Sequence, residues 1–402
     1  MELQQIEVRS TSTVATPRSR FNLSMLLLLA ASTLTHAATS TTSTTSTTQT
    51  VPATQVVRAA PFEAILQQAV AKDDFRGAVL LAQRGRILHA AAYGPADAAA
   101  GRANQLDTRF LIGSLTKSFT AIAVLQMVQQ GKLDLHRPIG HYLPGLRKDL
   151  GDKLTLHLLL KHQSGLATHL ERLVEQDERP ISSSEILQHI NRSKLQFAPG
   201  SQYEYGNLGY HLAALVLEQV SGGDYASVLQ QQIFVPSGMS RSGVERFAQR
   251  PAERANGYAK ALLGIEPDEN NVSWALGAGD IYATVHDLFR WDQALHQHAL
   301  LNPKHTALLF AGDSDERGNY GYGFRIQPYQ RSPQQAGATG TLVRHGGSMD
   351  GFLSNYHRYL EDELTVIVLG NIRPFAIRDL TFALKEAALG VSAGQRNRHT
   401  LE

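Results

Sequence analysis

The sequence predicts an α+β fold: an antiparallel sheet built from the N- and C-terminal segments, flanked by helices, with a mostly helical subdomain inserted between them. Two observations lead to this prediction. Runs rich in β-prone apolar residues lie near both ends of the chain, at 76–93 and 352–369. Residues 132–300 between them show helical periodicity and loops instead. No internal repeat suggests a solenoid or an array.

The first elements are a helix and a hairpin. Residues 61–72 carry apolar side chains near a 3.6-residue period, which predicts a helix. The β-prone runs 76–83 and 86–93 flank the dipeptide Arg84-Gly85. A short turn containing glycine between two such runs is typical of a β-hairpin.

The next elements are helices of the inserted region. Residues 116–130 are apolar on nearly every side and end at Gly131, which predicts a buried helix with a C-terminal glycine cap. Residues 208–220 and 287–296 are two further helices by the same periodicity. A buried helix at 116–130 matters because it would remove the lysine in its first turn from water.

The C-terminal region supplies the remaining strands. Residues 352–359 and 364–369 are strand-like, with a turn at 361–363 between them, and 375–389 reads as a final helix. We expect one folded domain at 59–395, with the helical subdomain at about 118–300, followed by a tail at 396–402.

Composition excludes several kinds of function. The 402 residues have a formal net charge of +2 and no basic stripe, which argues against a nucleic-acid partner. There is no cysteine, which excludes disulfides, thiolate metal sites and a cysteine nucleophile. A small-molecule or peptide substrate is the expected partner, and the oligomeric state is left open.

The N-terminus has the pattern of a targeting segment. Arg18 and Arg20 precede the apolar run 25–31, and small residues follow, so 1–37 is predicted to be a secretory signal peptide. Residues 38–58 are rich in Thr and Ser and read as a linker. This predicts a periplasmic or secreted bacterial protein. The apolar run is short for a bilayer, so no stable span is expected; a retained N-terminal anchor is the alternative.

Ser114 and Lys117 form the first candidate for chemistry. Positions i and i+3 lie on the same face of a helix, so the Lys117 amine can lie beside the Ser114 hydroxyl. The helix N-terminus favours the negative charge that develops there. A desolvated lysine has a lowered pKa and can accept the serine proton. A solvated helix start is the alternative interpretation of this spacing.

Tyr205 and Asn207 form the second candidate. They lie where a loop opens into the helix at 208–220, and a tyrosine near a lysine can transfer a proton to a leaving group. The alternative is a half-buried loop tyrosine with Asn207 as an ordinary helix cap.

His345, Gly346 and Gly347 form the third candidate. Two glycines in a strand allow another backbone or a ligand to approach closely, and a strand edge there would offer free N–H groups to a carbonyl oxygen. The alternative is a glycine-rich turn that only leads into the next strand.

Taken together and in this order, the three motifs resemble those of the penicillin-recognising serine hydrolases. The most similar branch is the class C β-lactamase-like group, which includes D-alanyl-D-alanine carboxypeptidases and some esterases. The resemblance spans about residues 60–390, and the segments 157–166, 276–284 and 320–324 also fit that group. It implies the β-lactamase/transpeptidase-like fold and a serine hydrolase activity.

The resemblance also implies catalytic roles. Ser114 would be the acylated nucleophile, and Lys117 would help to deprotonate it. Tyr205 would pass the proton to the leaving group and later activate water. Asn207 would contact the substrate amide.

The role of the third motif and two departures from the family pattern complete this assignment. The backbone N–H groups of Ser114 and Ser348 would form the oxyanion hole, and His345 and Gly347 would line the third wall of the site. Antibiotic-destroying lactamases usually carry lysine where this chain has His345. Histidine at its reference pKa of about 6.5 is mostly neutral at pH 7, which argues against efficient β-lactam hydrolysis. Gly206 stands where serine is usual, at a position that need not react.

Metal and cofactor chemistry is not expected. His157, His162 and His169 lack a two-ligand helical spacing, and no His-Glu-x-x-His motif occurs. The Gly-x-Ser-x-Gly nucleophile elbow is also absent, because Gly113-Ser114 lacks the second glycine. No Ser-Asp-Asn element is present, which argues against the class A lactamase type.

The sequence thus predicts an exported serine hydrolase that acts on an amide or ester bond through an acyl-enzyme on Ser114. A short-chain esterase of the same fold is one alternative. The other is a catalytically silent protein that binds cell-wall peptides.

Overall fold

A computed structural model describes residues 60–167, 179–247, 249–262, 264–268, 271–331 and 338–390. The predicted signal peptide (1–37), the linker (38–58) and the tail (396–402) lie outside the described residues and stay predictions.

The helices lie at both ends of the described chain and through its middle. Their bounds are α1 Ala60–Asp73, α2 Thr116–Gln129, α3 Lys148–Gly151, α4 Leu156–Leu160, α5 Ser183–Arg192, α6 Leu208–Ser221, α7 Tyr225–Leu229, α8 Val285–His296, α9 Pro303–Leu309 and α10 Ile377–Leu389. Short helical turns are η1 Gly113–Leu115, η2 Ile139–His141, η4 Gln230–Phe234, η5 Val272–Ala275 and η6 Asp315–Arg317.

The strands form one large sheet and three small ones. Their bounds are β1 Gly77–Gln83, β2 Arg86–Tyr93, β3 Pro95–Asp97, β4 Arg102–Ala103, β5 Phe110–Leu111, β6 Gly243–Val244, β7 Gly257–Ala261, β8 Gly264–Asp268, β9 Ile281–Ala283, β10 Arg325–Gln330, β11 Thr339–Met349, β12 Phe352–Tyr359 and β13 Leu364–Gly370. The large sheet is antiparallel with the order β10-β11-β12-β13-β1-β2, and the small sheets are β3-β4, β5-β9-β6 and β7-β8.

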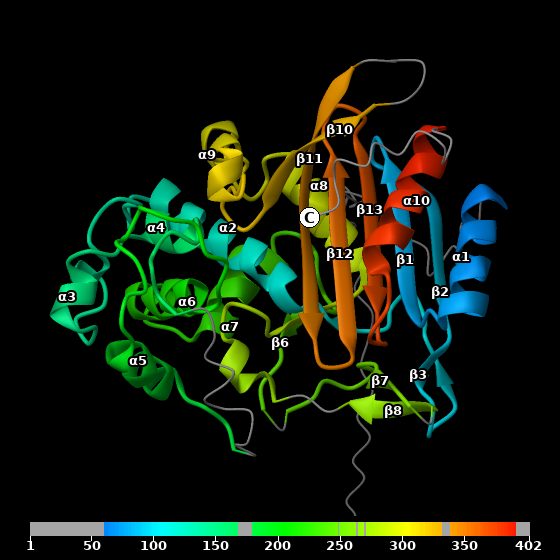
Figure 1. Cartoon of the computed structure of the whole chain (residues 1–402), viewed down its shortest axis with the longest axis horizontal. Coiled ribbons are helices and arrows are strands. Elements are labelled where there is room, and N and C mark those ends of the chain that lie inside the picture. Colours follow the sequence, from blue (N-terminus) through cyan, green and yellow to red (C-terminus); the bar gives the residue numbers. More distant parts are fainter. Residues whose placement is uncertain are drawn as a thin grey trace, which may run out of the picture. The chain divides into compact units, whose positions relative to one another are not determined.

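The large sheet joins the two ends of the folded chain, as predicted. Strand β1 pairs with β13, with Gly77 opposite Gly370 and Leu80 opposite Ile367. In Figure 1 the blue strands β1 and β2 accordingly lie beside the orange strands of the C-terminal region.

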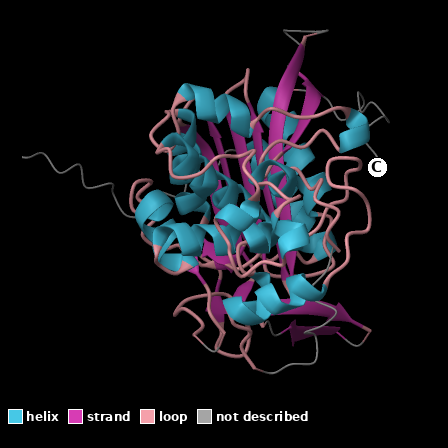
Figure 2. Cartoon of the chain, turned by 90° about the vertical axis from the view of Figure 1, so that its left-hand side faces the viewer, coloured by secondary structure: helices cyan, strands magenta, loops and turns pink. Residues whose placement is uncertain are grey.

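Helices cover both faces of this sheet, which explains why β1 and β13 are continuous apolar runs rather than alternating ones. Helices α1 and α10 pack on one face, and α8 and α2 belong to the core on the other. Side chains alternate between these two cores: Val79, Leu81, Val366 and Val368 enter the first, and Ala78, Leu80, Ile367 and Leu369 the second. Figure 2 shows the helices of the inserted region in front of the sheet.

Local sequence signals account for the boundaries of these elements. Arg84 and Gly85 both have positive φ, +50° and +72°, which is the backbone of a tight hairpin turn. Helix α2 is buried on every side from Thr116 to Met127, and Gly131 follows it with a φ of +71°. The predicted hairpin, buried helix and glycine cap are confirmed.

The inserted region contains more strand than predicted. Strands β6 to β9 lie within the part expected to be helix and loop, and β10 was not predicted at all. These strands are short or polar, so no alternation of apolar and polar residues marks them. Strands β6 and β9 pair over a long sequence separation, whereas β7 and β8 form a local hairpin. Among the described residues, no helix combines the length and the apolar composition needed to cross a membrane.

Candidate active site

Ser114 and Lys117 lie where a 3₁₀ turn passes into a helix. Ser114 is in η1, and Lys117 is in the first turn of α2. Nζ of Lys117 donates to Oγ of Ser114 over 3.0 Å, as the i,i+3 spacing predicts. Lys117 is fully buried, whereas Ser114 is partly exposed. The pair therefore presents a reachable hydroxyl beside an amine that is removed from water.

Uncharged oxygens surround the Lys117 amine. Besides Ser114, Nζ lies 2.7 Å from Oδ1 of Asn207 and 3.0 Å from the carbonyl oxygen of Ala278. A neutral amine has two N–H groups and one lone pair, so donation to Asn207 and Ala278 leaves the lone pair directed at the serine. An ammonium has three N–H groups and can donate to all three oxygens. The same geometry therefore fits Lys117 before and after it takes a proton.

The loop that carries Ala278 is fixed to the catalytic helix. Thr120 in α2 donates its hydroxyl to the carbonyl oxygen of Gly277 over 2.7 Å, and the Gly277 N–H donates to Oδ1 of Asp280 over 3.2 Å. Burial raises the pKa of Asp280 to about 8, so this carboxyl group is mostly neutral at pH 7. The Ala278 carbonyl is thus held in place without a full negative charge beside it.

Tyr205 and Asn207 reach the same amine from the loop before α6. Asn207 has the N-cap position of α6, yet its side chain makes no capping hydrogen bond, and its oxygen faces Lys117 instead. The Tyr205 ring centroid lies 5.1 Å from Nζ of Lys117, in the range of a cation–π contact. The interpretation of Asn207 as an ordinary cap is therefore wrong.

Two glycines let β11 approach the turn of Ser114. A Cβ atom on Gly113 would lie 2.7 Å from the backbone nitrogen of Ser348, and one on Gly347 would lie 1.9 Å from the carbonyl oxygen of Ile112. Both distances are too short for any side chain. The backbone of Gly347 and Ser348 thus packs directly on the turn of the nucleophile.

The third motif lies within a strand and not in a turn, so the alternative interpretation as a glycine-rich turn is wrong. Strand β10 pairs with β11 only from Thr339 to Arg344. From His345 to Met349, β11 pairs with β12 on one edge, and its other edge faces the turn that carries Ser114. This is the strand edge that the sequence predicts beside the nucleophile.

His345 is buried and both of its ring nitrogens have partners. Nδ1 lies 2.6 Å from the carbonyl oxygen of Gly346, which can only accept, so Nδ1 carries the hydrogen. Nε2 must then accept from the Tyr320 hydroxyl at 2.8 Å. Burial, and then the charge of Lys117, lowers the pKa of His345 to about 3. The histidine is thus neutral at pH 7, as its residue type predicts.

The residues predicted for the site therefore come together from three segments: the start of α2, the loop before α6, and β11. Sequence reasoning missed their aromatic surroundings. His162, buried with a φ of +57°, accepts the Gly206 N–H at Nδ1, and its ring centroid lies 4.3 Å from that of Tyr205. Tyr320 is 4.7 Å from His162 by ring centroids. Both belong to segments that the family resemblance includes, and that resemblance is the only sequence signal for them.

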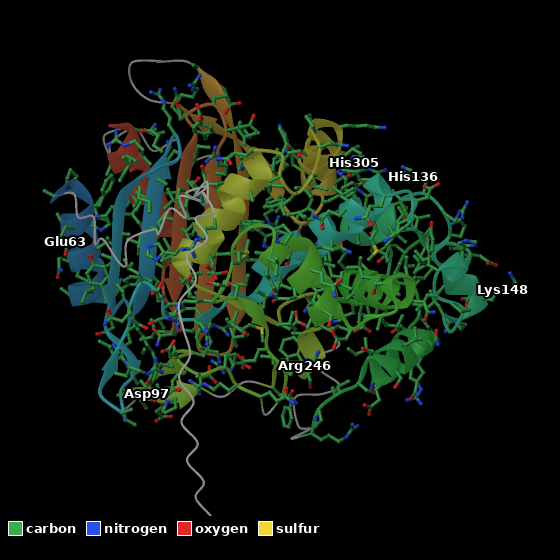
Figure 3. All side chains as sticks on the ribbon, turned by 180° about the vertical axis from the view of Figure 1, so that it is seen from behind. Glu63, Asp97, His136, Lys148, Arg246 and His305 are labelled. Atoms are coloured by element: carbon green, nitrogen blue, oxygen red, sulfur yellow. The ribbon has the colours of Figure 1, made fainter. Side chains whose placement is uncertain are left out.

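Other features of the structure lie apart from this site. A cavity of about 690 Å³ is lined by His136, His157 and His305 among others, and by none of the predicted site residues. Figure 3 shows His136 and His305 beside each other on the helical part of the chain. Within the described ranges, no three His, Cys, Asp or Glu side chains form a group able to hold a metal ion.

Comparison with known proteins agrees with the geometry. The chain is 29% identical over 321 residues to penicillin-binding protein 4* of Bacillus subtilis (strain 168), covering 75% of this chain and 69% of that protein. It is 29% identical over 377 residues to esterase EstB of Burkholderia gladioli, covering 82% and 94%.

Solved structures share the fold. The crystal structure of a D-amino acid amidase from Ochrobactrum anthropi SV3 superposes with a TM-score of 0.70 at 26% identity, covering 82% of this chain and 97% of that one. A sequence profile of the family described as Beta-lactamase matches residues 62–388. Because this match extends over nearly all of the described chain, the protein belongs to the Beta-lactamase family and is a serine hydrolase of that family.

Proposed function

We propose that this chain hydrolyses an amide or ester bond through an acyl-enzyme on Ser114, in the manner of a D-alanyl-D-alanine carboxypeptidase or a related amidase. The observation that carries the proposal is the 3.0 Å contact between Nζ of Lys117 and Oγ of Ser114, with uncharged acceptors around the amine. A reachable hydroxyl beside a buried amine is what a serine nucleophile and its base require.

In the acylation step, Oγ of Ser114 attacks the substrate carbonyl while its proton passes to Nζ of Lys117. The new C–O bond places negative charge on the carbonyl oxygen. The N–H groups of Ser114 and Ser348 would donate to that oxygen, which is supported by the close packing of Gly113 against Ser348. Such donors are most effective when they are already fixed before the reaction.

In the second step, the tetrahedral intermediate loses its amine or alcohol, which takes a proton by way of Tyr205. A water then attacks the ester carbonyl while its proton passes by way of Tyr205 to Lys117. The new tetrahedral intermediate breaks its bond to Oγ of Ser114, which takes that proton back as the acid leaves. The position of the Tyr205 ring beside the Lys117 amine supports this relay, because the cation stabilises negative charge on the phenol oxygen. Asn207 bonds to Lys117 and would also contact the substrate amide.

Efficient β-lactam hydrolysis is not part of the proposal. The third wall has a neutral, buried histidine where the antibiotic-destroying lactamases usually have a constant cation. Acylation of Ser114 by an amide or ester does not itself require that cation, so peptidase and esterase chemistry remain compatible with His345.

A short-chain esterase of the same fold is the second candidate. It is supported by the alignment to esterase EstB, which covers 94% of that protein. The two candidates share the nucleophile and the oxyanion donors and differ only in the leaving group.

We also propose that the protein is exported, with 1–37 removed as a signal peptide and the catalytic domain at 59–395. The basic and apolar pattern before residue 37 supports export, as does the similarity to a penicillin-binding protein. Mass spectrometry of the mature protein tests this, because an intact residue 1–37 segment would contradict it.

The function is tested by labelling and by a substrate panel. Ser114→Ala should abolish labelling by a fluorophosphonate, whereas Ser240→Ala, an exposed serine away from the site, should label normally. Nitrophenyl esters, nitrocefin and acyl-D-Ala-D-Ala peptides then separate esterase, lactamase and peptidase activity. Labelling that persists in Ser114→Ala contradicts the proposed nucleophile. Peptide binding without turnover, unchanged by Ser114→Ala, would instead indicate a silent binding protein.

A further inference from the structure

The cavity in the helical part of the chain has no part in the chemistry at Ser114. Its volume, about 690 Å³, is in the range of pockets that bind small organic ligands. Backbone hydrogen bonds hold its walls together. The His157 N–H donates to the Leu135 carbonyl oxygen over 2.9 Å, and the Tyr322 N–H donates to that of Leu309 over 2.9 Å. The cavity is therefore formed before any ligand arrives.

Three exposed cations lie along the lining of this cavity. Lys132 follows the end of α2, Lys304 is in the first turn of α9, and Arg137 is in the segment after α2. The two helix ends are joined, because the Asn302 N–H donates to Oε1 of Gln129 over 2.9 Å. The two lysines thus belong to the same wall although they are far apart in the sequence.

These three cations have no acidic partner. Among the described residues, no carboxylate forms an ion pair with Lys132, Arg137 or Lys304, and Arg137 donates only to Nε2 of His141, over 3.1 Å. An exposed cation on α3 differs, since Lys148 forms an ion pair with the aspartate four residues later at 2.6 Å. The N–H groups of the two lysines are therefore available to a ligand.

The carboxylates of the cavity do not cancel the positive charge. Asp313 lies 3.6 Å from Nζ of Lys161, which is buried, and so compensates that fourth cation. Asp134 already accepts the backbone N–H of His136 at Oδ1, over 2.9 Å. Among the described residues of the lining, four lysine and arginine side chains face two carboxylates. A concave surface with a surplus of one charge concentrates ions of the opposite charge.

The lining also has an apolar part. Leu133 and Leu135 are buried, and Leu308 and the rings of Tyr142 and Tyr322 lie beside them in the same cavity. Apolar and aromatic side chains together with a few polar groups are the usual lining of a small-molecule site. A ligand that fits both parts has an anionic group on an apolar body.

We propose that this cavity is a second ligand site, which binds a phosphate monoester carried on an apolar or aromatic body. Such a phosphate has a charge of about −1.5 to −2 at pH 7 and three acceptor oxygens. It therefore matches a surplus of two cations and three side chains with free or partly free N–H groups. Lysine and arginine are the usual protein partners of phosphate. The site is independent of the proposed function, because it requires no reaction at Ser114.

Calorimetric titration with phenyl phosphate at low ionic strength tests this inference. The native protein should bind one molecule with a Kd below about 1 mM, and at least about tenfold more tightly than inorganic phosphate or phenol. The first comparison measures the apolar body, and the second measures the charge. Phenyl phosphate should also raise the Tm of the native protein, because it binds the folded state alone.

Variants locate the bound phosphate. Lys132→Gln/Lys304→Gln should weaken the binding of phenyl phosphate by about tenfold or more, since two charge-assisted contacts are lost. Both side chains are exposed, so the Tm without ligand should not change. Lys72→Gln is the control, because Lys72 is an exposed lysine on α1, at the other face of the sheet. Lys117→Met removes the cation of the catalytic site and should bind phenyl phosphate as the native protein does.

The outcomes separate this inference from the proposed function. Failure of the native protein to bind phenyl phosphate, or equal binding by Lys132→Gln/Lys304→Gln, would overturn the second site. A loss of binding in Lys117→Met but not in the double variant would place the phosphate in the catalytic site and would also overturn it. None of these results depends on whether Ser114 is labelled by a fluorophosphonate, which tests the proposed function alone.

Discussion

Tyr320 donates its hydroxyl hydrogen to Nε2 of His345 over 2.8 Å, and both side chains are buried. A second tyrosine two residues later makes a similar contact outside the site: the Tyr322 hydroxyl lies 2.7 Å from Nδ1 of His157. The chain therefore offers a matched pair of tyrosine–histidine bonds, one in the third wall of the site and one lining the separate cavity.

Tyr320→Phe should lower both stability and activity. It leaves the buried Nε2 of His345 without a donor, which costs about 1–3 kcal/mol in the free energy of unfolding. It also frees the ring in the third wall, and we expect kcat/KM to fall by about 10- to 100-fold. Tyr322→Phe should lower stability but change kcat/KM by less than about twofold. Urea unfolding and ester turnover measure both, and an active Tyr320→Phe enzyme would contradict the role given to this bond.

Lys117→Met should abolish rapid acylation, because it keeps the length of the side chain and removes the base. We expect the second-order rate of fluorophosphonate labelling to fall by about 10²- to 10⁴-fold. Lys385→Met is the control: Lys385 is also buried and donates to the carbonyl oxygen of Gln330, but it lies on α10 at the opposite face of the sheet. An undiminished labelling rate in Lys117→Met would rule out this lysine as the base.

Gly347→Ala should disrupt the oxyanion wall. The added methyl group would lie 1.9 Å from the Ile112 carbonyl oxygen, so β11 must move away from the turn of Ser114. We expect kcat to fall by about 10²-fold or more, in the range seen when an oxyanion donor is lost. Gly223→Ala, where the nearest neighbouring atom is 3.9 Å away, is the control. Normal kcat in Gly347→Ala would show that this close approach is not needed.

The free energy of unfolding should decrease as the pH falls below about 6.5. Burial lowers the pKa of His345 to about 3 and those of His211 and His296 to about 4. Between those values and the unfolded value of about 6.5, the unfolded chain binds protons that the folded chain does not, so acid favours unfolding by up to about 1.4 kcal/mol per pH unit for each histidine.

The pKa shift of Asp280 has the opposite effect on how the free energy of unfolding changes with pH. Its folded pKa of about 8 lies above its unfolded value, so between about pH 4 and pH 8 the folded state holds a proton that the unfolded state lacks. Burial also lowers the pKa values of His162 and His357 and raises that of Glu245, so the histidines outnumber the two carboxyl groups and leave a net loss of stability on acidification. Urea unfolding at pH 7.0, 6.0 and 5.0 at constant ionic strength measures it, and equal stability across this range would contradict the buried neutral state of the histidines.

The sequence predicts those elements whose signal is local. Helix α2 has apolar residues on nearly every side and strand β13 is a continuous apolar run, and both lie within a few residues of their predicted bounds. Strand β10 escapes prediction because it contains Pro328 and polar residues, which an edge strand tolerates and a central strand does not. Its existence depends on pairing with β11, which no local pattern shows.

The contacts of the candidate site likewise include some that follow from local sequence and others that depend on tertiary structure. The contact between Ser114 and Lys117 follows from helical spacing alone. Tyr205 and His345 could be joined to them only through the family resemblance, because tertiary structure brings them together.

The pairing of β1 with β13 has a consequence for how the enzyme matures. Strand β1, which is the first strand along the chain, pairs with β13 near the end of the chain. The turn of Ser114 is also held by β12, where the Ser354 hydroxyl donates to the Ile112 carbonyl oxygen. Contacts this distant in sequence make folding slow and leave a growing chain without its sheet. The nucleophile therefore has no oxyanion wall until synthesis is nearly complete, and a nascent chain released early is a hydrolase that cannot yet act.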